Sequence, residues 1–95
     1  MPHSLSAKKR VRQNVRRREY NRVVKSRIRT ARRAFQKAMD SQDLEAARQR
    51  LRTCERLLHR AAGRGPLHRN TAARIIGRMQ SRLAARQKAA AAQSP

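Results

Sequence analysis

The chain has 95 residues, which is enough for one small domain. It carries 26 Lys and Arg against 5 Asp and Glu, a formal charge of +21, and its only aromatic residues are one Tyr and one Phe. A charge this one-sided indicates a polyanionic partner, while the single cysteine and the lack of a long apolar run disfavour a disulfide scaffold and a membrane-spanning protein.

Helical segments account for most of the chain. Ala, Arg, Leu and Gln dominate, β-branched residues are few, and apolar residues recur every three or four positions. We expect three helices, at residues 6–39, 43–62 and 66–90. The breaks between them are DSQD at 40–43 and GRGP at 63–66. We expect disordered tails at residues 1–5 and 91–95.

The first helix is the most basic part of the chain, with fourteen Lys and Arg and only one acidic residue, Glu19, among residues 8–37. Its apolar stripe has bulky residues only from Val24 onward. The first helix should be about 50 Å long and the second about 30 Å. We therefore expect the amino-terminal half of the first helix to project beyond the other helices as a basic arm. The stripe consists of Ala7, Val11, Val15, Val24, Ile28, Ala31, Phe35 and Ala38.

Repulsion between like charges should weaken this helix. Six pairs of basic residues stand four positions apart: Lys8/Arg12, Arg12/Arg16, Arg18/Arg22, Lys25/Arg29, Arg29/Arg33 and Arg33/Lys37. Such pairs destabilise a helix by roughly 1–3 kcal/mol in sum. The arm is therefore predicted to be frayed in the free protein and to order when a polyanion binds.

The helix ends are predicted from capping residues. Ser6 is a candidate N-cap for the first helix, and Asp43 or Ser41 for the second. Gly63 is the candidate left-handed residue at the end of the second helix, and Pro66 suits the first turn of the third. Short connections favour antiparallel neighbours, so the predicted fold is all-α: an up-down-up antiparallel three-helix bundle formed by a single domain over residues 1–95.

Apolar stripes of the second and third helices define the rest of the expected core. The second stripe is Leu44, Ala47, Leu51, Cys54, Leu58 and Ala61, and the third is Ala72, Ile76, Met79 and Leu83, with Ile75 beside it. On the third helix Arg74, Arg78 and Arg82 recur every four residues as a basic ridge.

Several sites with special chemistry are disfavoured. Cys54, His59 and His68 do not have zinc-ligand spacing, and no catalytic pair of carboxylates is evident, so we expect no metal, no cofactor and no enzymatic activity. His68 stands at the start of the third helix, where it either approaches phosphate or packs in the turn. Tyr20 either stacks on RNA or packs against the bundle.

Folded RNA is the preferred polyanion. Arg suits bidentate phosphate contacts, and the scarcity of aromatics argues against a platform for single strands. Zinc-finger spacing and leucine heptads are missing, so recognition of folded RNA by shape and phosphate is favoured. The alternatives are a DNA-compacting, histone-like protein and a membrane-active cationic peptide, although the arm has only Ala and Val on its stripe.

Two blocks carry a family resemblance. SAKKR at residues 6–10, followed by Gln13, Asn21, Ser26 and Arg29–Thr30, resembles the first helix of bacterial small-subunit ribosomal protein S twenty (S20). GPLHRNTAAR at residues 65–74 resembles the start of that family's third helix. Ile75, Ile76 and Gly77 depart from the family's usual Lys-Lys-Ser and make this part of the helix more apolar.

The resemblance implies a structural, non-enzymatic protein in the cytoplasm that binds small-subunit ribosomal RNA and helps the subunit to assemble. Its implied partners are the 5′ domain and the long penultimate helix of that RNA, with few or no protein contacts, no membrane and no small-molecule substrate. The expected RNA-binding residues are Lys8, Lys9, Arg10, Arg12, Gln13, Arg16, Arg17, Asn21, Arg22, Lys25, Ser26, Arg29, Thr30, Arg33, His68, Arg69, Asn70, Arg74, Arg78 and Arg82.

Overall fold

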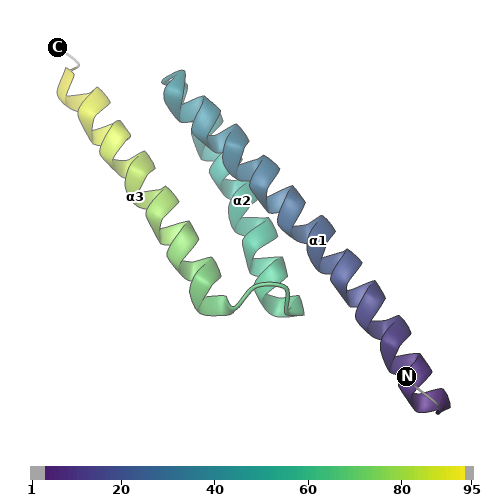
Figure 1. Cartoon of the computed structure of the whole chain (residues 1–95). Helices are drawn as coiled ribbons and strands as arrows, with labels where there is room; N and C mark the ends of the chain where they lie inside the picture. Colours follow the sequence, from purple (N-terminus) through teal and green to yellow (C-terminus); the bar gives the residue numbers. More distant parts are fainter. Residues whose placement is uncertain (1–3, 94–95) are drawn as a thin grey trace.

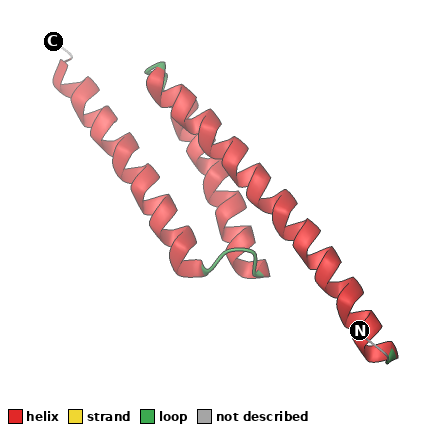
Figure 2. Ribbon diagram, in the orientation of Figure 1, coloured by secondary structure: helices red, strands yellow, loops and turns green. Residues whose placement is uncertain are grey.

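The computed structural model describes residues 4–93, which form three helices and, within that range, no strand (Figure 2). They are α1 (Leu5–Asp40), α2 (Leu44–Arg64) and α3 (Arg69–Gln93). The chain runs up α1, down α2 and up α3, so α1 and α3 point the same way (Figure 1). The prediction of an all-α, up-down-up bundle is confirmed.

The outer ends of the helices differ from the sequence prediction. The N-cap of α1 is Ser4 rather than Ser6, and its Oγ accepts a hydrogen bond of 3.1 Å from the amide of Ala7. Leu5 and residues 91–93 are helical, so the expected tails at 1–5 and 91–95 were too long. The remaining parts of those tails, residues 1–3 and 94–95, lie outside the described residues.

The α1–α2 turn joins the two helices through shared backbone hydrogen bonds. Gln42 adopts a left-handed conformation with φ of 61°, and its amide donates to the carbonyl of Met39. The amide of Asp43 donates to the carbonyl of Ala38, which completes a Schellman motif. Asp43 also caps α2, because its Oδ1 accepts from the amide of Ala46 at 3.1 Å. One residue thus ends α1 and begins α2.

The α2–α3 turn lies two residues later than predicted. Gly65, not Gly63, is the left-handed residue, with φ of 99°, and its amide donates to the carbonyl of Ala61. The residue before a proline is disfavoured in the α conformation, so Pro66 ends α2 at this point. Pro66 itself precedes α3 by three residues, which corrects its expected place in the first turn of that helix.

The core is a single apolar cluster to which all three helices contribute. Its buried members are Ile28, Phe35, Ala38 and Met39 of α1, Ala47, Leu51, Cys54, Leu58 and Ala61 of α2, and Ala72, Ile76, Met79 and Leu83 of α3. All but Met39 lie on the predicted stripes. Within residues 4–93 no polar or charged residue is buried. The core therefore forms by the hydrophobic effect alone, with every charge kept at the surface.

α2 is the central helix of the bundle. It packs closely against both α1 and α3, whereas the backbones of α1 and α3 approach each other much less (Figure 1). Small residues help to explain this, because Ala47 and Ala61 are fully buried on α2 and allow its neighbours to come close. The side of the bundle opposite α2 is consequently left open between α1 and α3.

Cys54 belongs to this core rather than to a reactive site. Its side chain is fully buried, and burial raises the pKa of its thiol; the positive charge of Arg32 lowers that pKa and the negative charge of Glu55 raises it further. A buried thiol with a raised pKa is protonated at neutral pH and a poor nucleophile.

The amino-terminal part of α1 extends past the end of α2, as predicted (Figure 1). We call residues 5–23 the basic arm. The apolar side chains of Leu5, Val11 and Val15 are exposed, and the first buried residue of α1 is Ile28. The molecule is accordingly long and thin, with extents of 74 × 21 × 16 Å.

Replacing Leu58 by Ala should destabilise the bundle by about 2–5 kcal/mol, because it removes a large side chain from a fully buried position. Urea denaturation followed by circular dichroism measures this change. Val15→Ala, on the exposed side of the arm, serves as the control and should change the unfolding free energy by less than about 0.5 kcal/mol. Equal effects of the two substitutions would contradict the assigned core.

Candidate nucleic-acid interface

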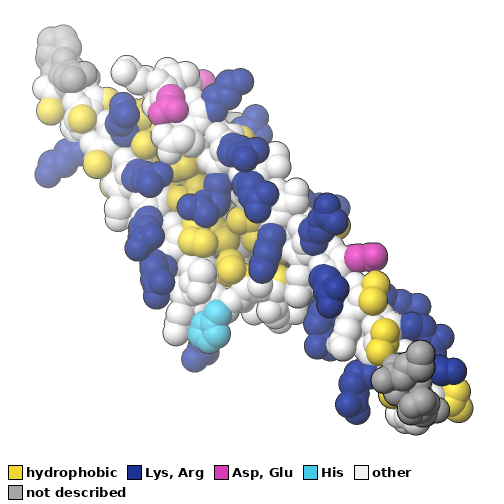
Figure 3. Space-filling view, viewed as in Figure 1, with side chains coloured by type: hydrophobic (Ala, Val, Ile, Leu, Met, Phe, Trp, Pro, Cys, Tyr) yellow, Lys and Arg dark blue, Asp and Glu magenta, His cyan; other side chains and the backbone are white. Residues whose placement is uncertain are grey.

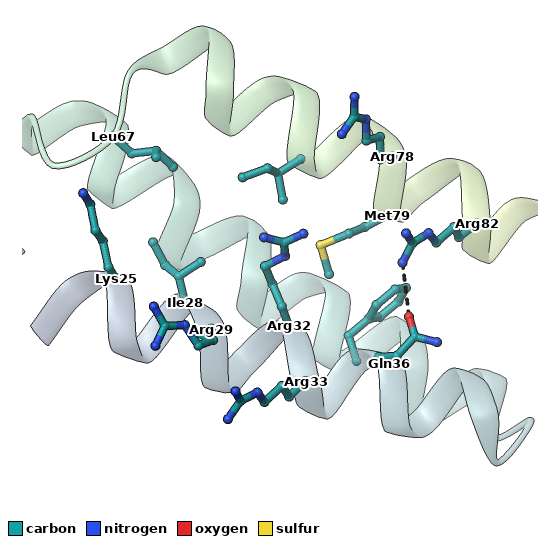
Figure 4. Close-up of a pocket in the computed structure, with 12 residues that line it drawn as sticks. Lys25, Ile28, Arg29, Arg32, Arg33, Gln36, Leu67, Arg78, Met79 and Arg82 are labelled. Atoms are coloured by element: carbon teal, nitrogen blue, oxygen red, sulfur yellow. Dashed lines mark hydrogen bonds between the residues drawn. The ribbon is translucent and has the colours of Figure 1, made fainter. Parts of the chain in front are cut away.

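A groove with a basic rim lies between α1 and α3, on the side of the bundle away from α2. Its rim consists of Lys25, Arg29, Arg32 and Arg33 from α1 and Arg78 and Arg82 from α3 (Figure 4). Its floor is apolar and includes Ile28, Leu67, Ile75 and Met79. Figure 3 shows this face as a strip of apolar atoms flanked by Lys and Arg side chains.

The groove follows directly from helix periodicity. Residues four apart lie on the same side of a helix, one turn above another. Arg29 and Arg33 have this spacing on α1, and Arg78 and Arg82 have it on α3. Because α1 and α3 run in the same direction, the two rows lie along opposite walls of the groove, on either side of the apolar floor. The structure thus brings together four arginines that the sequence predicted separately.

A short hydrogen-bond chain connects the two walls of the groove. Arg82 donates from Nη1 to Oε1 of Gln36 at 3.1 Å (Figure 4). Gln36 in turn donates from Nε2 to Oδ1 of Asp40 at 2.9 Å. The bond orients the guanidinium of Arg82 toward α1. Among residues 4–93 the other rim cations make no ion pair or side-chain hydrogen bond, so their donors remain available to an anion.

A second group of predicted residues meets where the arm joins the bundle. The predicted residues Asn21, Arg22, Lys25, Ser26 and Arg29, together with Arg18, which was not predicted, line a shallow hollow along α1. Asn21 is half-buried there, and the other five are exposed. Thr30 is less suited to a phosphate than predicted, because its hydroxyl donates to the carbonyl of Ser26 at 3.1 Å. The hollow leads directly into the groove, since Lys25 and Arg29 line both.

The remaining predicted residues are exposed but lie farther apart. Lys8, Lys9, Arg10, Arg12 and Gln13 lie on several sides of the arm, and Arg69, Asn70 and Arg74 are on the first turns of α3. These two sets are not brought into one site.

Tyr20 sits at the base of the arm in a hollow that it shares with Arg16, Arg17, Asn21 and Arg64. Its side chain is 39% exposed, which leaves part of the ring open to an incoming base and part packed on neighbours. Both uses that the sequence left open for Tyr20 are therefore compatible with its position.

His68 is the N-cap of α3. Its Nδ1 accepts a hydrogen bond of 3.1 Å from the amide of Asn70, the second residue of the helix. Nδ1 must be unprotonated to accept, so a neutral ring carries its proton on Nε2. The side chain is exposed rather than packed on α2, which leaves the Nε2–H free to donate outward. The imidazole of His68 thus caps α3 through Nδ1 and offers the Nε2–H as a hydrogen-bond donor at the surface.

Some residues that line the site were not predicted from the sequence. Arg32 lines the groove, Arg18 lines the hollow along α1 and Arg64 lines the hollow with Tyr20, yet none of the three was among the expected RNA-binding residues. Arg32 lies three positions after Arg29 and one before Arg33, so helical spacing was the available signal. For Arg64 the sequence held no such signal, because the approach of this residue to the arm depends on how α2 packs against α1.

Other kinds of site find little support. No group of His, Cys, Asp or Glu within residues 4–93 is arranged to hold a metal ion. None of the helices, over the residues that the structure describes, is both long and apolar enough to cross a membrane. The groove is open and lined by cations without a carboxylate, a composition suited to binding an extended anion.

Replacing His68 by Ala should destabilise the protein by about 0.5–2 kcal/mol, because the amide of Asn70 loses its acceptor. His68→Asn retains a side-chain acceptor at the cap and should restore most of the stability. Thermal denaturation of the three proteins measures the difference. Equal stability of the Ala and Asn variants would contradict a capping role.

Comparison with known proteins identifies the family. The family model described as "Ribosomal protein S20" matches residues 2–88. Among similar proteins named "Small ribosomal subunit protein bS20", that of Ruegeria sp. is 48% identical over 89 residues, covering 94% of this chain and 98% of the relative. Those of Dinoroseobacter shibae (45% over 85 residues, 90% and 97%) and Persephonella marina (40% over 83 residues, 87% and 90%) are also similar.

This agreement confirms the resemblance seen in the two sequence blocks and the expectation of a structural, non-enzymatic protein. With a match over most of its length and three such relatives, the chain belongs to the ribosomal protein S20 family of the small ribosomal subunit.

Proposed function

We propose that this protein is a structural constituent of the small ribosomal subunit that binds small-subunit ribosomal RNA directly and helps the subunit to assemble. The observation that carries the proposal is the groove between α1 and α3, where six cations from two helices surround an apolar floor. Family membership supplies the setting, a ribosome in the cytoplasm.

Phosphate is the group that this rim suits best. Arginine presents a planar fork of donors that matches two phosphate oxygens, and binding several phosphates releases condensed counterions. The groove holds no base-reading arrangement, so positioning on the sugar–phosphate backbone dominates. Ile75 and Leu67 on the floor offer an apolar surface to sugars or an unstacked base.

The proposed contacts extend over the twenty residues predicted from the sequence, all of which are exposed except the half-buried Asn21. We assign them to one RNA-binding domain. The 5′ domain of the RNA and its long penultimate helix are the proposed targets, with few or no protein contacts. Arg32 joins the contact residues because it stands on the rim beside Arg29.

The basic arm supports the same proposal. It is helical from Leu5, yet α2 meets it only at its base, near Arg64, and its cations are spread around the axis. In the free protein their repulsion favours fraying, and RNA phosphates reverse the sign of that energy. Binding of RNA and stabilisation of the arm helix are therefore coupled.

Replacing Arg29 by Ala should weaken binding to the 5′ domain of ribosomal RNA about tenfold, because the groove then has one charge-assisted hydrogen bond fewer. The plot of log affinity against log salt should become shallower by roughly 0.7–0.9 for each phosphate that the variant no longer binds. Filter binding at several salt concentrations measures both. Arg10→Ala tests the arm in the same way.

Arg27→Ala is the control for this experiment, since Arg27 is exposed on α1 outside the groove and the hollows. It should change the affinity much less than Arg29→Ala. Duplex DNA at the same salt concentration is the second comparison. If the protein bound duplex DNA as tightly as it binds the RNA, the DNA-compacting alternative would replace this proposal.

Amide hydrogen exchange tests the coupling of the arm to RNA. In the free protein at low salt, amides of residues 8–20 should exchange rapidly, while those of α2 around Leu58 should be protected by the core. Addition of the 5′ domain should slow exchange in the arm by at least about tenfold, because bound RNA lowers the fraction of time that the arm helix is open. Slow exchange in the arm of the free protein would contradict the coupling.

A further inference from the structure

α2 carries a row of arginines that the groove does not use. Arg48, Arg52, Arg56, Arg60 and Arg64 follow one another at intervals of four residues along the helix. We call these five residues the α2 ladder. Each step rises about 6 Å along the axis, and the whole row spans about 24 Å. All five side chains are exposed.

The middle of the α2 ladder lies on the face of α2 that points away from the core, and Arg48 and Arg64 lie toward the two edges of that face, because each four-residue step turns about 40° around the helix. The buried residues of α2 are Ala47, Leu51, Cys54, Leu58 and Ala61, which cluster on one side at 100° per residue. On the same projection Arg56, the middle of the ladder, falls opposite the centre of that cluster. Since the core also forms the floor of the α1–α3 groove, the ladder and the groove face opposite sides of the bundle.

The charge of the α2 ladder is not neutralised within the protein. Glu55, the acidic residue nearest to its middle, accepts a hydrogen bond of 2.8 Å from Nε2 of Gln80 on α3. Over residues 4–93, no ladder arginine makes an ion pair or a side-chain hydrogen bond. Like charges four residues apart destabilise a helix, so the row weakens α2, and no carboxylate of the described residues forms an ion pair with it.

One end of the α2 ladder meets the arm. Arg64 lines the hollow at the base of the arm together with Arg16, Arg17 and Tyr20. Basic side chains thus continue from the outer face of α2 onto α1 without an intervening carboxylate in that hollow. A polyanion that follows the ladder can pass directly onto the arm.

We propose that the outer face of α2 binds the sugar–phosphate backbone of an RNA segment separate from the one in the α1–α3 groove. Consecutive ladder arginines are spaced like consecutive phosphates along a nucleic-acid strand, and each presents a fork of donors. The bundle is only 21 × 16 Å across, so it separates two RNA segments by about one protein layer. The protein is then a spacer that fixes the distance between them. This proposal rests on the RNA-binding function proposed above.

The test uses two variants of the full-length protein in which the same amount of charge is removed. The ladder variant carries Arg52→Gln, Arg56→Gln and Arg60→Gln. The control variant carries Arg27→Gln, Arg50→Gln and Lys88→Gln, at exposed positions outside both surfaces. Gln keeps helix propensity, and circular dichroism checks that both variants stay folded. Hydroxyl-radical footprinting on full-length small-subunit ribosomal RNA then maps the nucleotides that each protein protects.

The wild-type protein and the control variant should protect the same two sets of nucleotides. The ladder variant should fail to protect one set and should retain the other. For the ladder variant, the slope of log affinity against log salt concentration should be shallower than for the control variant by roughly 0.7–0.9 for each phosphate that the ladder no longer binds. A third variant, Arg29→Gln with Arg33→Gln, should fail to protect the set that the ladder variant retains.

The outcomes separate the two proposals. If the groove variant loses protection while the ladder variant matches the control, the ladder does not bind RNA and this inference is overturned, with the proposed function intact. That result would indicate an acidic protein surface, rather than RNA, as the partner of the ladder. If wild-type protein protects no nucleotides, the proposed function itself fails.

Discussion

Repulsion among basic side chains is the constraint on which the rest of this structure depends. A chain of 95 residues with a formal charge of +21 must be held together by a core of thirteen buried apolar side chains within residues 4–93. That core admits no charged or polar residue among those described, and so every cation is at the surface. Spreading those cations over an elongated shape, 74 Å in its longest dimension, keeps them farther apart than a compact globule would.

The central position of α2 links this constraint to function. The apolar face of α2 packs against both α1 and α3. The two outer helices therefore stay separated on the other side, with a groove between them. The groove gathers cations from two helices around an apolar floor, where an anion would relieve repulsion in both rows at once. Binding of RNA and relief of internal repulsion are then the same electrostatic event.

The protein has several basic surfaces, and these surfaces differ in how their cations are arranged. The α1–α3 groove collects cations from two helices, the arm presents them around a single helix, and the α2 ladder sets them in a row. A small bundle with such surfaces on opposite sides can hold RNA segments at a fixed spacing. It needs no cavity, metal or catalytic group for that purpose.

Much of the fold could be predicted from the sequence, because helix formation and core selection depend on local periodicity. The apolar stripes identified Phe35, Leu58 and Met79 as core residues, and the early weakness of the first stripe predicted the arm. The bundle topology followed from two short connections. The helix ends were predicted less accurately. Gly63 and Gly65 can both end a helix in a left-handed conformation, and the neighbouring Pro66 favours Gly65.

What the tertiary structure alone decided is which basic residues line the same surface. Arg33 and Arg82 are 49 positions apart in the sequence, and no periodicity relates a residue on one helix to a residue on another. Their meeting on one groove depends on how α2 separates α1 from α3, and the same packing turns the α2 ladder outward. The sequence by itself determined the charge, the helices and their apolar faces; packing in three dimensions decided how that charge is divided into surfaces.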